Sequence, residues 1–444
     1  MKYPKCRALL TMEAMVKYEL AIKNGKVFLK DKIIQADIGI ENGKIARAAK
    51  IVEGFKVINA SKMLVLPGSI DVHVHFREPG LTHKEDWYTG SCAAAAGGVT
   101  SVIDQPNTIP PTTTAKAFKK KLKLAKQKSI VDFGINAGVI EKSEIEEMWK
   151  LGAIAFGEIF LADSMAVDYS FLNSALERIG KLQGLACVHA EDSGLIMQNL
   201  KKYKNLTPIS YSRVRSPRCE ALAIQRVLGL YEKLKIKPRL HICHLSTKLG
   251  LKLLKQSSCT AEVTPHHLLL NLKDCNRLGN LAKVNPPLRS KVDQLAVLRA
   301  FIKGEVSILA SDHAPHLPIE KQDLCSSPSG MPGVETMIPL LLALVKKRLI
   351  PLEKLVNAAS KNPARIFKIK NKGEIKPGMD ADLLITDLKP MKIKAKRLHS
   401  KCNWTPFEGF EAIFPKLTLL RGEVIFQGNV TCERGFGRIL MRND

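Results

Sequence analysis

Short apolar runs alternate with longer segments of helical periodicity through the middle of the chain. The runs are five to nine residues long and cover 69–76, 99–104, 131–139, 153–160, 185–189, 239–245, 259–264 and 306–312. Amphipathic stretches such as 112–127 and 220–234 lie between them. Alternation of this kind predicts a parallel sheet covered by helices, and eight units predict a closed (β/α)₈ barrel. An open doubly wound sheet is the alternative, but no G-x-G-x-x-G turn follows a predicted strand.

The two ends of the chain have a different pattern. Residues 18–66 alternate in short apolar and polar runs, and the pairs Asn24-Gly25 and Asn42-Gly43 are tight-turn signals. Residues 373–387 and 412–428 continue in the same way. Both ends are therefore predicted to form small antiparallel strands outside the barrel.

Composition changes this picture little, whereas the charge raises a question. The chain has 444 residues, of which 45% are hydrophobic and 25% charged, as is usual for a globular protein. The net charge is +27, which would suit a nucleic-acid or membrane surface. The lysines are dispersed, however, and the densest run, 116–128, has the pattern of an amphipathic helix with a solvated face. We therefore expect attraction of anionic metabolites and no nucleic-acid partner.

The location of the protein is predicted from missing signals. No apolar stretch reaches the roughly 20 residues that span a bilayer, and Glu13 interrupts the only apolar run near the first residues. The ten cysteines include no C-x-x-C pair, which favours reduced thiols over disulfides or a cysteine zinc site. We expect a cytoplasmic protein without membrane contact.

Candidate metal ligands lie at the ends of four predicted strands. His73 and His75 are two residues apart, so they point to the same side of a strand. His189, His244 and Asp312 end three other runs. In a parallel barrel these ends meet on one face, where active sites lie. A single buried histidine is more often a core residue, but the set of five predicts a metal site.

The donor types indicate the metal and the number of ions. Imidazole and carboxylate ligands without thiolate suit Zn²⁺, with Mn²⁺, Co²⁺ or Fe²⁺ as alternatives. Four histidines and an aspartate fit two ions better than one, and a two-metal site needs a bridging carboxylate. Glu158 lies inside the apolar run 153–160, where a buried charge requires a partner or a metal. It is our candidate for the bridge, and Asp163 is the second choice.

These residues predict hydrolysis of an amide bond. A water molecule activated by metal attacks a carbonyl carbon, and a neighbouring carboxylate carries the proton to the leaving nitrogen. Asp312 is the candidate for that carboxylate. Arg77 suits a substrate carboxylate, while Asn107, Asn285 and His316 lie on loops where they could bind imide or amide groups. For the two asparagines, a turn or capping role stays open.

Several motifs in a fixed order carry a resemblance to a known family. They are PGSIDVHVHFREPG (67–80), GGVTSVIDQPNT (97–108), VHAED (188–192), CHLST (243–247), EVTPHH (262–267), NPPLR (285–289), SDHAPH (311–316), GVET (333–336) and GEIKPGMDADLLITD (373–387). The chain resembles the cyclic amidohydrolases, most closely their dihydroorotase branch. The resemblance implies a barrel over 67–372 and a small β-sandwich built from 1–66 and 373–444.

The resemblance also implies roles for single residues. The implied metal ligands are His73, His75, His189, His244 and Asp312, with Asp312 also acting as general base and acid. The implied substrate contacts are Arg77, Asn107, Asn285 and His316. The implied reaction is the reversible, zinc-dependent hydrolysis of dihydroorotate to N-carbamoyl-aspartate in pyrimidine synthesis, with one or two ions per chain.

The chain departs from the family pattern at the bridging position. Many relatives have a carbamylated lysine there and others an aspartate, whereas this chain has Glu158. Allantoinases and dihydropyrimidinases rely on the lysine, so the departure counts against both, and Arg77 counts further against dihydropyrimidinase. Allantoinase or another cyclic amidohydrolase is the nearest alternative. A non-catalytic scaffold for aspartate transcarbamoylase is less favoured, because every candidate ligand is present.

Two further expectations concern assembly and motion. A homo-oligomer or a complex with aspartate transcarbamoylase is compatible with an intact site. Segment 325–333, rich in serine, proline and glycine, is expected to be a flexible loop near the site.

Overall fold

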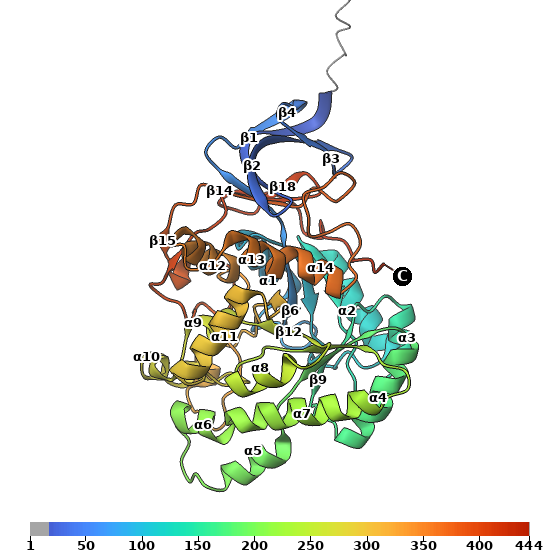
Figure 1. The fold of residues 1–444 in the computed structure, drawn as a ribbon, viewed down its shortest axis with the longest axis vertical. Helices are drawn as coiled ribbons and strands as arrows, with labels where there is room; N and C mark the ends of the chain where they lie inside the picture. Colours follow the sequence, from blue (N-terminus) through green and yellow to red (C-terminus); the bar gives the residue numbers. More distant parts are fainter. Residues whose placement is uncertain (1–16, 444) are drawn as a thin grey trace, which may run out of the picture.

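Eight parallel strands form the centre of the molecule in the computed structural model, which describes residues 17–443 (Figure 1). They are β6 (Ser69–Val74), β7 (Val99–Asp104), β8 (Asp132–Ile135), β9 (Phe156–Phe160), β10 (Leu185–His189), β11 (Arg239–Ile242), β12 (Thr260–Val263) and β13 (Ile308–Leu309). Strands β6–β8 and β9–β13 form two sheets in chain order. The parallel bridges Ala137–Phe156 and Val74–His313 join the sheets on both sides and close the ring. The predicted strands are confirmed, each within its apolar run.

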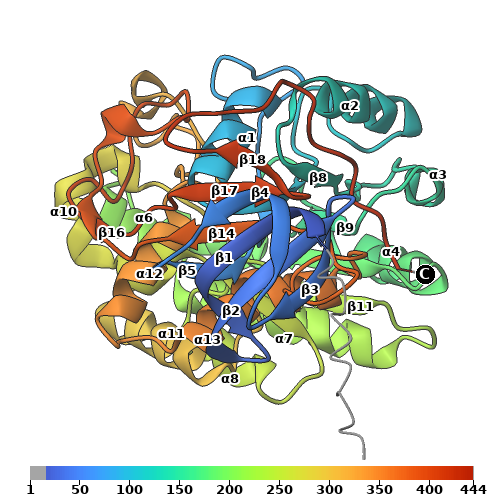
Figure 2. The same ribbon diagram turned by 90° about the horizontal axis from the view of Figure 1, so that it is seen from above.

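Helices follow the strands and cover the outside of the ring (Figures 1 and 2). They are α1 (Trp87–Ala96), α2 (Ala115–Lys128), α3 (Ile145–Lys150), α4 (Tyr169–Lys181), α5 (Ser193–Leu200), α6 (Pro208–Val214), α7 (Pro217–Lys233), α8 (Lys248–Leu254), α9 (Pro265–Leu269), α10 (Cys275–Leu278), α11 (Lys291–Lys303), α12 (Met337–Lys346), α13 (Leu352–Val356) and α14 (Asn362–Ile366).

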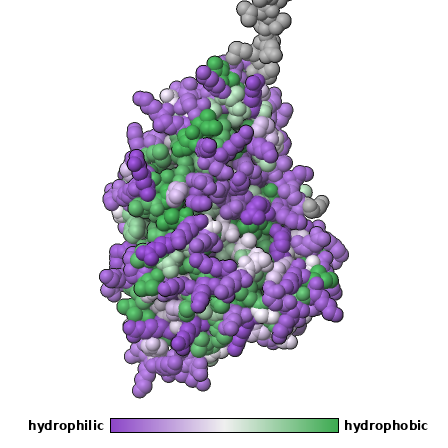
Figure 3. Space-filling view, viewed as in Figure 1, coloured by the Kyte–Doolittle hydropathy of each residue, from purple (hydrophilic) through white to green (hydrophobic). Residues whose placement is uncertain are grey.

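Helix α2 shows how the lysine-rich run folds. It buries Ala117, Phe118 and Ala125 and leaves most of its lysines toward water, as its pattern predicts. Lys121 is an exception, because it is fully buried and donates to Asp104 Oδ2 at 2.6 Å. Hydrophilic side chains cover most of the visible face of the molecule, with apolar side chains between them (Figure 3). Within residues 17–443, no helix has both the length and the hydropathy needed to cross a bilayer.

Strands from both chain ends build a second, smaller sheet at one end of the barrel (Figures 1 and 2). They are β1 (Lys17–Leu29), β2 (Lys32–Glu41), β3 (Lys44–Ala49), β4 (Glu53–Asn59), β5 (Leu64–Pro67), β14 (Leu383–Thr386), β17 (Leu417–Leu420) and β18 (Glu423–Phe426). All eight strands are hydrogen-bonded in one sheet, and β14 pairs with β5, which joins the two ends. A separate pair, β15 (Met391–Lys392) and β16 (Glu411–Ala412), completes the strands of the described chain.

Two details of the small sheet differ from the prediction. Asn42-Gly43 makes the turn between β2 and β3, as expected, but Asn24-Gly25 lies inside β1 at a register shift. Both β4 and β5 run parallel to β1, whereas antiparallel pairing was predicted throughout. A bulge absorbs the turn signal when the strand has partners on both sides of it. The boundaries at residues 66 and 372 stay a prediction, and residues 1–16 lie outside the described part.

Candidate active site

The six candidate metal ligands come together where the barrel strands end. His73 lies in β6 and His75 directly after it, Glu158 in β9, His189 at the end of β10, and His244 and Asp312 just past β11 and β13. All six side chains are buried. A carboxyl end of each of these strands therefore contributes one or two polar groups to the same point, as the barrel topology requires.

Glu158 lies between two pairs of histidines. Its Oε1 is 2.8 Å from His189 Nδ1 and 2.6 Å from His244 Nε2. Its Oε2 faces the other pair, at 3.4 Å from His73 Nε2 and 3.9 Å from His75 Nε2. Burial opposes ionisation of this carboxyl group, but the charge of His73 and the hydrogen bonds from His189 and His244 hold its pKa well below the usual value. Each oxygen of one ionised carboxylate thus serves a different histidine pair.

Asp312 completes the first of these two groups. Its Oδ1 lies 3.2 Å from His75 Nε2 and 3.7 Å from His73 Nε2. Ligand atoms bound at 2.0–2.2 Å to one tetrahedral or octahedral ion are about 3.0–3.6 Å apart. Among His73, His75, Asp312 and Glu158 Oε2, the distances of 3.2 and 3.4 Å lie within that spacing, and those of 3.7 and 3.9 Å lie just beyond it. Within residues 17–443 the buried His73 Nε2 has no hydrogen-bond partner. This group therefore fits a metal ion.

The second group is closer together. Glu158 Oε1, His189 Nδ1 and His244 Nε2 have the separations of hydrogen bonds, below those expected around an ion. The donor types still suit a divalent metal, and binding there would need the carboxylate to move apart from the rings by a few tenths of an ångström. The ligand atoms of the first group are therefore already separated enough for an ion, whereas those of the second group must first move apart.

Buried side chains behind the histidines fix their orientation. Glu262 in β12 lies 2.5 Å from His73 Nδ1 and 3.1 Å from His241 Nε2, and its pKa is lowered by the His73 charge despite burial. Asn107 Oδ1 lies 2.6 Å from His75 Nδ1. A hydrogen bond at Nδ1 leaves Nε2 to the metal, an arrangement common in metal sites. Glu262 was missed among the candidates, although it also is a charge inside an apolar strand.

The backbone bends sharply at several of these residues. Arg77, His244 and Asp312 have φ angles of 61°, 33° and 47°, in the left-handed region that side chains other than glycine seldom occupy. Gly157 has φ 134°, and a Cβ there would collide with the carbonyl oxygen of Cys187. Such conformations cost free energy and are concentrated at functional sites. The barrel core therefore holds these side chains in positions that the local sequence alone would not favour.

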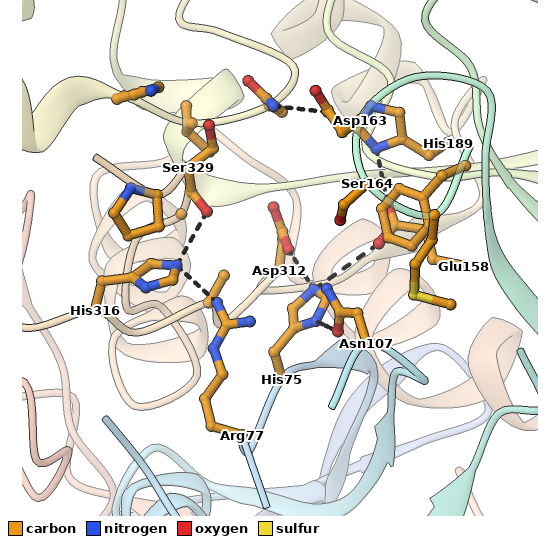
Figure 4. Close-up of a pocket in the computed structure, with 18 of the residues that line it drawn as sticks. His75, Arg77, Asn107, Glu158, Asp163, Ser164, His189, Asp312, His316 and Ser329 are labelled. Atoms are coloured by element: carbon orange, nitrogen blue, oxygen red, sulfur yellow. Dashed lines mark hydrogen bonds and ion pairs between the residues drawn. The ribbon is translucent and has the colours of Figure 1, made fainter. Parts of the chain in front are cut away.

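A cavity of about 440 Å³ opens above the cluster (Figure 4). It is lined by all the candidate residues except His73 and His244. Arg77 points into the cavity and is held by the Pro315 carbonyl oxygen at 3.3 Å and by His316 Nε2 at 2.9 Å. Among residues 17–443, its Nη1 has no hydrogen-bond partner. A buried guanidinium with an open N–H is suited to a carboxylate ligand.

His316 lies between two cations. Its Nε2 is beside Arg77, and its Nδ1 is 3.0 Å from Lys84 Nζ. Burial and the charges of Arg77, Lys84 and Lys321 lower the pKa of His316 far below its usual value. His316 is therefore a neutral ring that can exchange hydrogen bonds without adding charge to the cavity.

The opposite wall holds Asn285. Its Oδ1 accepts a hydrogen bond from Tyr211 OH at 2.6 Å, and its Nδ2 donates to Asp163 Oδ2 at 3.0 Å. The other oxygen of Asp163 is paired with Arg215. The two oxygens of Asp163 are thus engaged by Asn285 and Arg215 and not by a histidine, so the structure does not support the second choice for a bridging carboxylate. Tyr211 was missed, because one tyrosine in a polar stretch gives no sequence signal.

A family profile described as the amidohydrolase family matches residues 64–424. The chain belongs to this family. A dihydroorotase of Methanosarcina acetivorans is 46% identical, with 95% of this chain and 95% of that protein covered. A dihydroorotase of Archaeoglobus fulgidus is 39% identical over 92% of this chain and 99% of that protein. Family members depend on a metal, and the cluster described above contains groups that could hold one.

Solved structures with the same fold carry different names. An L-hydantoinase (dihydropyrimidinase) from Arthrobacter aurescens superposes with a TM-score of 0.91, at 31% identity, over 96% of this chain and 100% of that chain. A D-hydantoinase from Thermus sp. has a TM-score of 0.88 at 26% identity, over 95% of this chain and 99% of that chain. All these names belong to enzymes that act on cyclic amides, and this chain is a hydrolase of that class.

Proposed function

We propose that this chain is a dihydroorotase, which reversibly hydrolyses (S)-dihydroorotate to N-carbamoyl-L-aspartate in the synthesis of pyrimidines. One observation carries the choice among cyclic amides: Arg77 directs an unengaged N–H into the cavity beside the histidine and carboxylate cluster. Dihydroorotate has a ring carboxylate for this guanidinium, whereas hydantoins and dihydropyrimidines lack it. The identity to proteins named dihydroorotase supports the same substrate.

We assign the metal to Zn²⁺, with one or two ions per chain. The proposed ligands are His73, His75, Glu158, His189, His244 and Asp312. A bound zinc would polarise the amide carbonyl and make water a nucleophile at neutral pH. The wider spacing of the first group supports tighter binding there, while the closer second group supports weaker binding. Glu158 would be shared by both ions.

The proton is carried by Asp312 in this proposal. Burial raises its pKa, but the hydrogen bond with His75 and the charges of His73 and His75 lower it more, so that the pKa lies below the usual value. The carboxylate is therefore ionised at neutral pH and can accept a proton. It lines the cavity within reach of a bound ring and would return that proton to the leaving ring nitrogen.

The substrate is held from two sides. Arg77 would bind the carboxylate, and the neutral His316 would exchange a hydrogen bond with it or with the neighbouring ring atom. Asn285 faces the ring from the opposite wall. Asn107 lines the cavity but also fixes His75, so its expected effect combines both roles. A homo-oligomer, a complex with aspartate transcarbamoylase and a cytoplasmic location stay predictions.

The test is a side-by-side assay of purified, zinc-supplemented protein. Dihydroorotate, allantoin and hydantoin are offered separately, and bound metal is counted in the same preparation. Turnover of dihydroorotate alone supports the proposal, and preferential turnover of either other ring contradicts it. His73→Ala is expected to lose metal and turnover while the circular dichroism spectrum is kept. An active His73→Ala protein would remove that residue from the ligand set.

A further inference from the structure

We propose that Arg215 is a positioning residue that links the metal half formed by His189 and His244 to the substrate wall at Asn285. The inference rests on the proposed function for the meaning of these two places. It goes further in naming a buried group, touching neither substrate nor metal, that makes their geometries depend on each other.

Arg215 directly follows α6 and is almost completely buried, with 3% of its side chain exposed. Its guanidinium holds two carboxylates. Nη1 donates to Glu191 Oε2 at 2.7 Å, and Nη2 donates to Asp163 Oδ1. A guanidinium is planar and rigid. If one carboxylate shifts and the guanidinium follows it, the N–H groups that face the other carboxylate change direction as well. Arg289 Nη1 donates to the backbone carbonyl of Arg215 and braces this position from behind.

The hydrogen bond from Arg215 to Glu191, the first arm of the link, leads to the metal half formed by His189 and His244. The Glu191 oxygen that accepts from Arg215 also faces His189 Nε2 at 2.9 Å. This contact occupies Nε2 and leaves Nδ1 toward Glu158. Arg215 therefore holds the Glu191 carboxylate in place, and Glu191 sets the ring of His189.

The second arm leads to the substrate wall. Asp163 Oδ2 accepts from Asn285 Nδ2 at 3.0 Å, which orients the amide so that its oxygen receives the Tyr211 hydroxyl. Asp163 itself has φ 73°, a left-handed conformation. Figure 4 shows Asp163 beside His189 at the upper edge of the cavity. Within residues 17–443, Arg215 is the group that donates to the Oδ1 of Asp163, so without it Asp163 would hold the Asn285 amide less firmly and Tyr211 would be left as the other contact.

The experiment uses Asp163→Asn and Glu191→Gln, which each weaken one arm, together with Arg215→Lys. Arg226→Lys is the matched control, since Arg226 donates to Asp192 at 2.5 Å and is half-exposed. For each variant, KM and kcat for dihydroorotate are measured, with the dissociation constant of zinc and the Tm. Asp163→Asn is the decisive variant, because 43% of that side chain is exposed and folding is not at risk.

Linkage predicts that each change is felt at both ends. Asp163→Asn should raise KM about tenfold with a small change in kcat, and Glu191→Gln should weaken zinc binding about tenfold. Asp163→Asn should also raise the dissociation constant of zinc about threefold, and Glu191→Gln should also raise KM about threefold, because the two ends are coupled. Arg215→Lys should move both quantities, because one ammonium cannot hold two carboxylates in a fork. Arg226→Lys should move neither.

The proposal is overturned if each variant changes only its own end, or if Arg215→Lys behaves as wild type. Failure of the proposed function is a separate result. If wild-type protein leaves dihydroorotate unchanged, the zinc dissociation constant of Asp163→Asn still decides the linkage. Asp163 contacts no proposed zinc ligand, so a purely local role predicts an unaltered constant, whereas the link through Arg215 predicts a weaker one.

Discussion

The carboxylate of Glu262 lies within hydrogen-bond distance of two imidazole rings in the barrel, 2.5 Å from His73 Nδ1 and 3.1 Å from His241 Nε2. Only His73 of these two also faces Glu158. Glu262 therefore acts on the proposed metal from behind its ligand. At the scale of single residues, the site is a set of such pairs, in which a buried group holds the ring that does the binding.

Glu262→Gln should weaken zinc binding by about 10–100-fold, because an amide holds the His73 ring less firmly and makes it a poorer donor. Zinc titration with a competing chelator measures the change. Glu335→Gln is the control, since Glu335 is also buried but pairs with His399 on the outside of the barrel. Equal affinities for Glu262→Gln and wild type would mean that His73 is oriented without this carboxylate.

Arg77→Lys should raise KM for dihydroorotate about 10–100-fold while kcat changes less. Lysine keeps the charge, but it cannot make two parallel hydrogen bonds to one carboxylate, and charged hydrogen bonds contribute about 1.5–3 kcal/mol each. Steady-state kinetics over a range of substrate concentration measures the effect. If KM stays within twofold of the wild-type value, Arg77 is not the carboxylate site.

How far the sequence predicts the site also depends on the kind of residue. His73, His75, His189, His244 and Asp312 could be found because each lies at or near the end of an apolar run, and Glu158 because it interrupts one. Arg215, Tyr211 and Glu191 could not be found in this way. Their roles depend on contacts with residues of other segments, or on orienting a histidine ring that itself faces the site. The sequence likewise predicts the eight barrel strands but not the parallel pairing of β4 and β5 with β1.

At the scale of elements, the segment from 324 to 330 is held by two lysines. Lys283 Nζ donates to the carbonyl oxygens of Leu324, Cys325 and Ser327 at 2.5–3.3 Å. Lys321 Nζ donates to the carbonyl oxygens of Lys283, Pro328 and Gly330 at 2.8–3.0 Å. Most of it lies within 325–333, which was expected to be flexible, yet five of its carbonyl oxygens accept hydrogen bonds from these two lysines. It forms a rim of the cavity through Pro328, Ser329 and Gly330.

Lys321→Met should loosen this rim, because three carbonyl oxygens lose their donor. KM should rise about threefold to tenfold, and cleavage by a nonspecific protease within 322–331 should become faster. Overall stability should change by less than about 1 kcal/mol, since removing a buried cation also removes its desolvation cost. Lys346→Met is the control, because Lys346 donates to the Leu388 carbonyl oxygen away from the cavity. Unchanged cleavage would show that Lys283 suffices.

A second contact between elements depends on pH. His399 Nδ1 is 2.9 Å from Glu335 Oε1, next to the start of α12, and this hydrogen bond raises the pKa of His399 above its usual value. A raised histidine pKa stabilises the fold fully below the unfolded pKa, and the contribution is lost as pH rises through the folded pKa. The side chain is 31% exposed, so the contribution should stay below about 1 kcal/mol.

The measurement compares wild type with His399→Gln at about pH 6 and pH 8, by urea unfolding. The difference in free energy of unfolding should be larger at the lower pH. There the folded protein holds His399 protonated and paired with Glu335, and this charge is lost as the pH rises. His83→Gln serves as control, since His83 is 55% exposed where it meets Glu320. A difference that is constant with pH, or larger at pH 8, would contradict the sign argued here.

At the scale of the whole molecule, the barrel and the small sheet are joined by a buried charge cluster. Lys372 Nζ is 2.6 Å from Asp132 Oδ2 in β8 of the barrel. It also lies 2.7 Å from Asp382 Oδ2 and 3.0 Å from Asp380 Oδ2, just before β14 of the small sheet. Arg421, after β17, pairs with the other oxygen of Asp132. Asp132 is the first residue of β8, so these ion pairs hold the small sheet against the amino ends of the barrel strands. The candidate metal ligands lie at the opposite, carboxyl ends.

Lys372→Met should lower the free energy of unfolding by about 3–5 kcal/mol, because it leaves the buried carboxylates of Asp132 and Asp382 without their shared cation. Only 4% of the Lys372 side chain is exposed, so water cannot replace it. Guanidinium-induced unfolding measures the loss, and Lys370→Met, on an exposed neighbour, is the control. Adding Asp382→Asn to Lys372→Met should restore part of the stability, since one uncompensated charge is then removed. A double variant less stable than Lys372→Met would mean that packing of the lysine stem, and not its charge, joins the two parts.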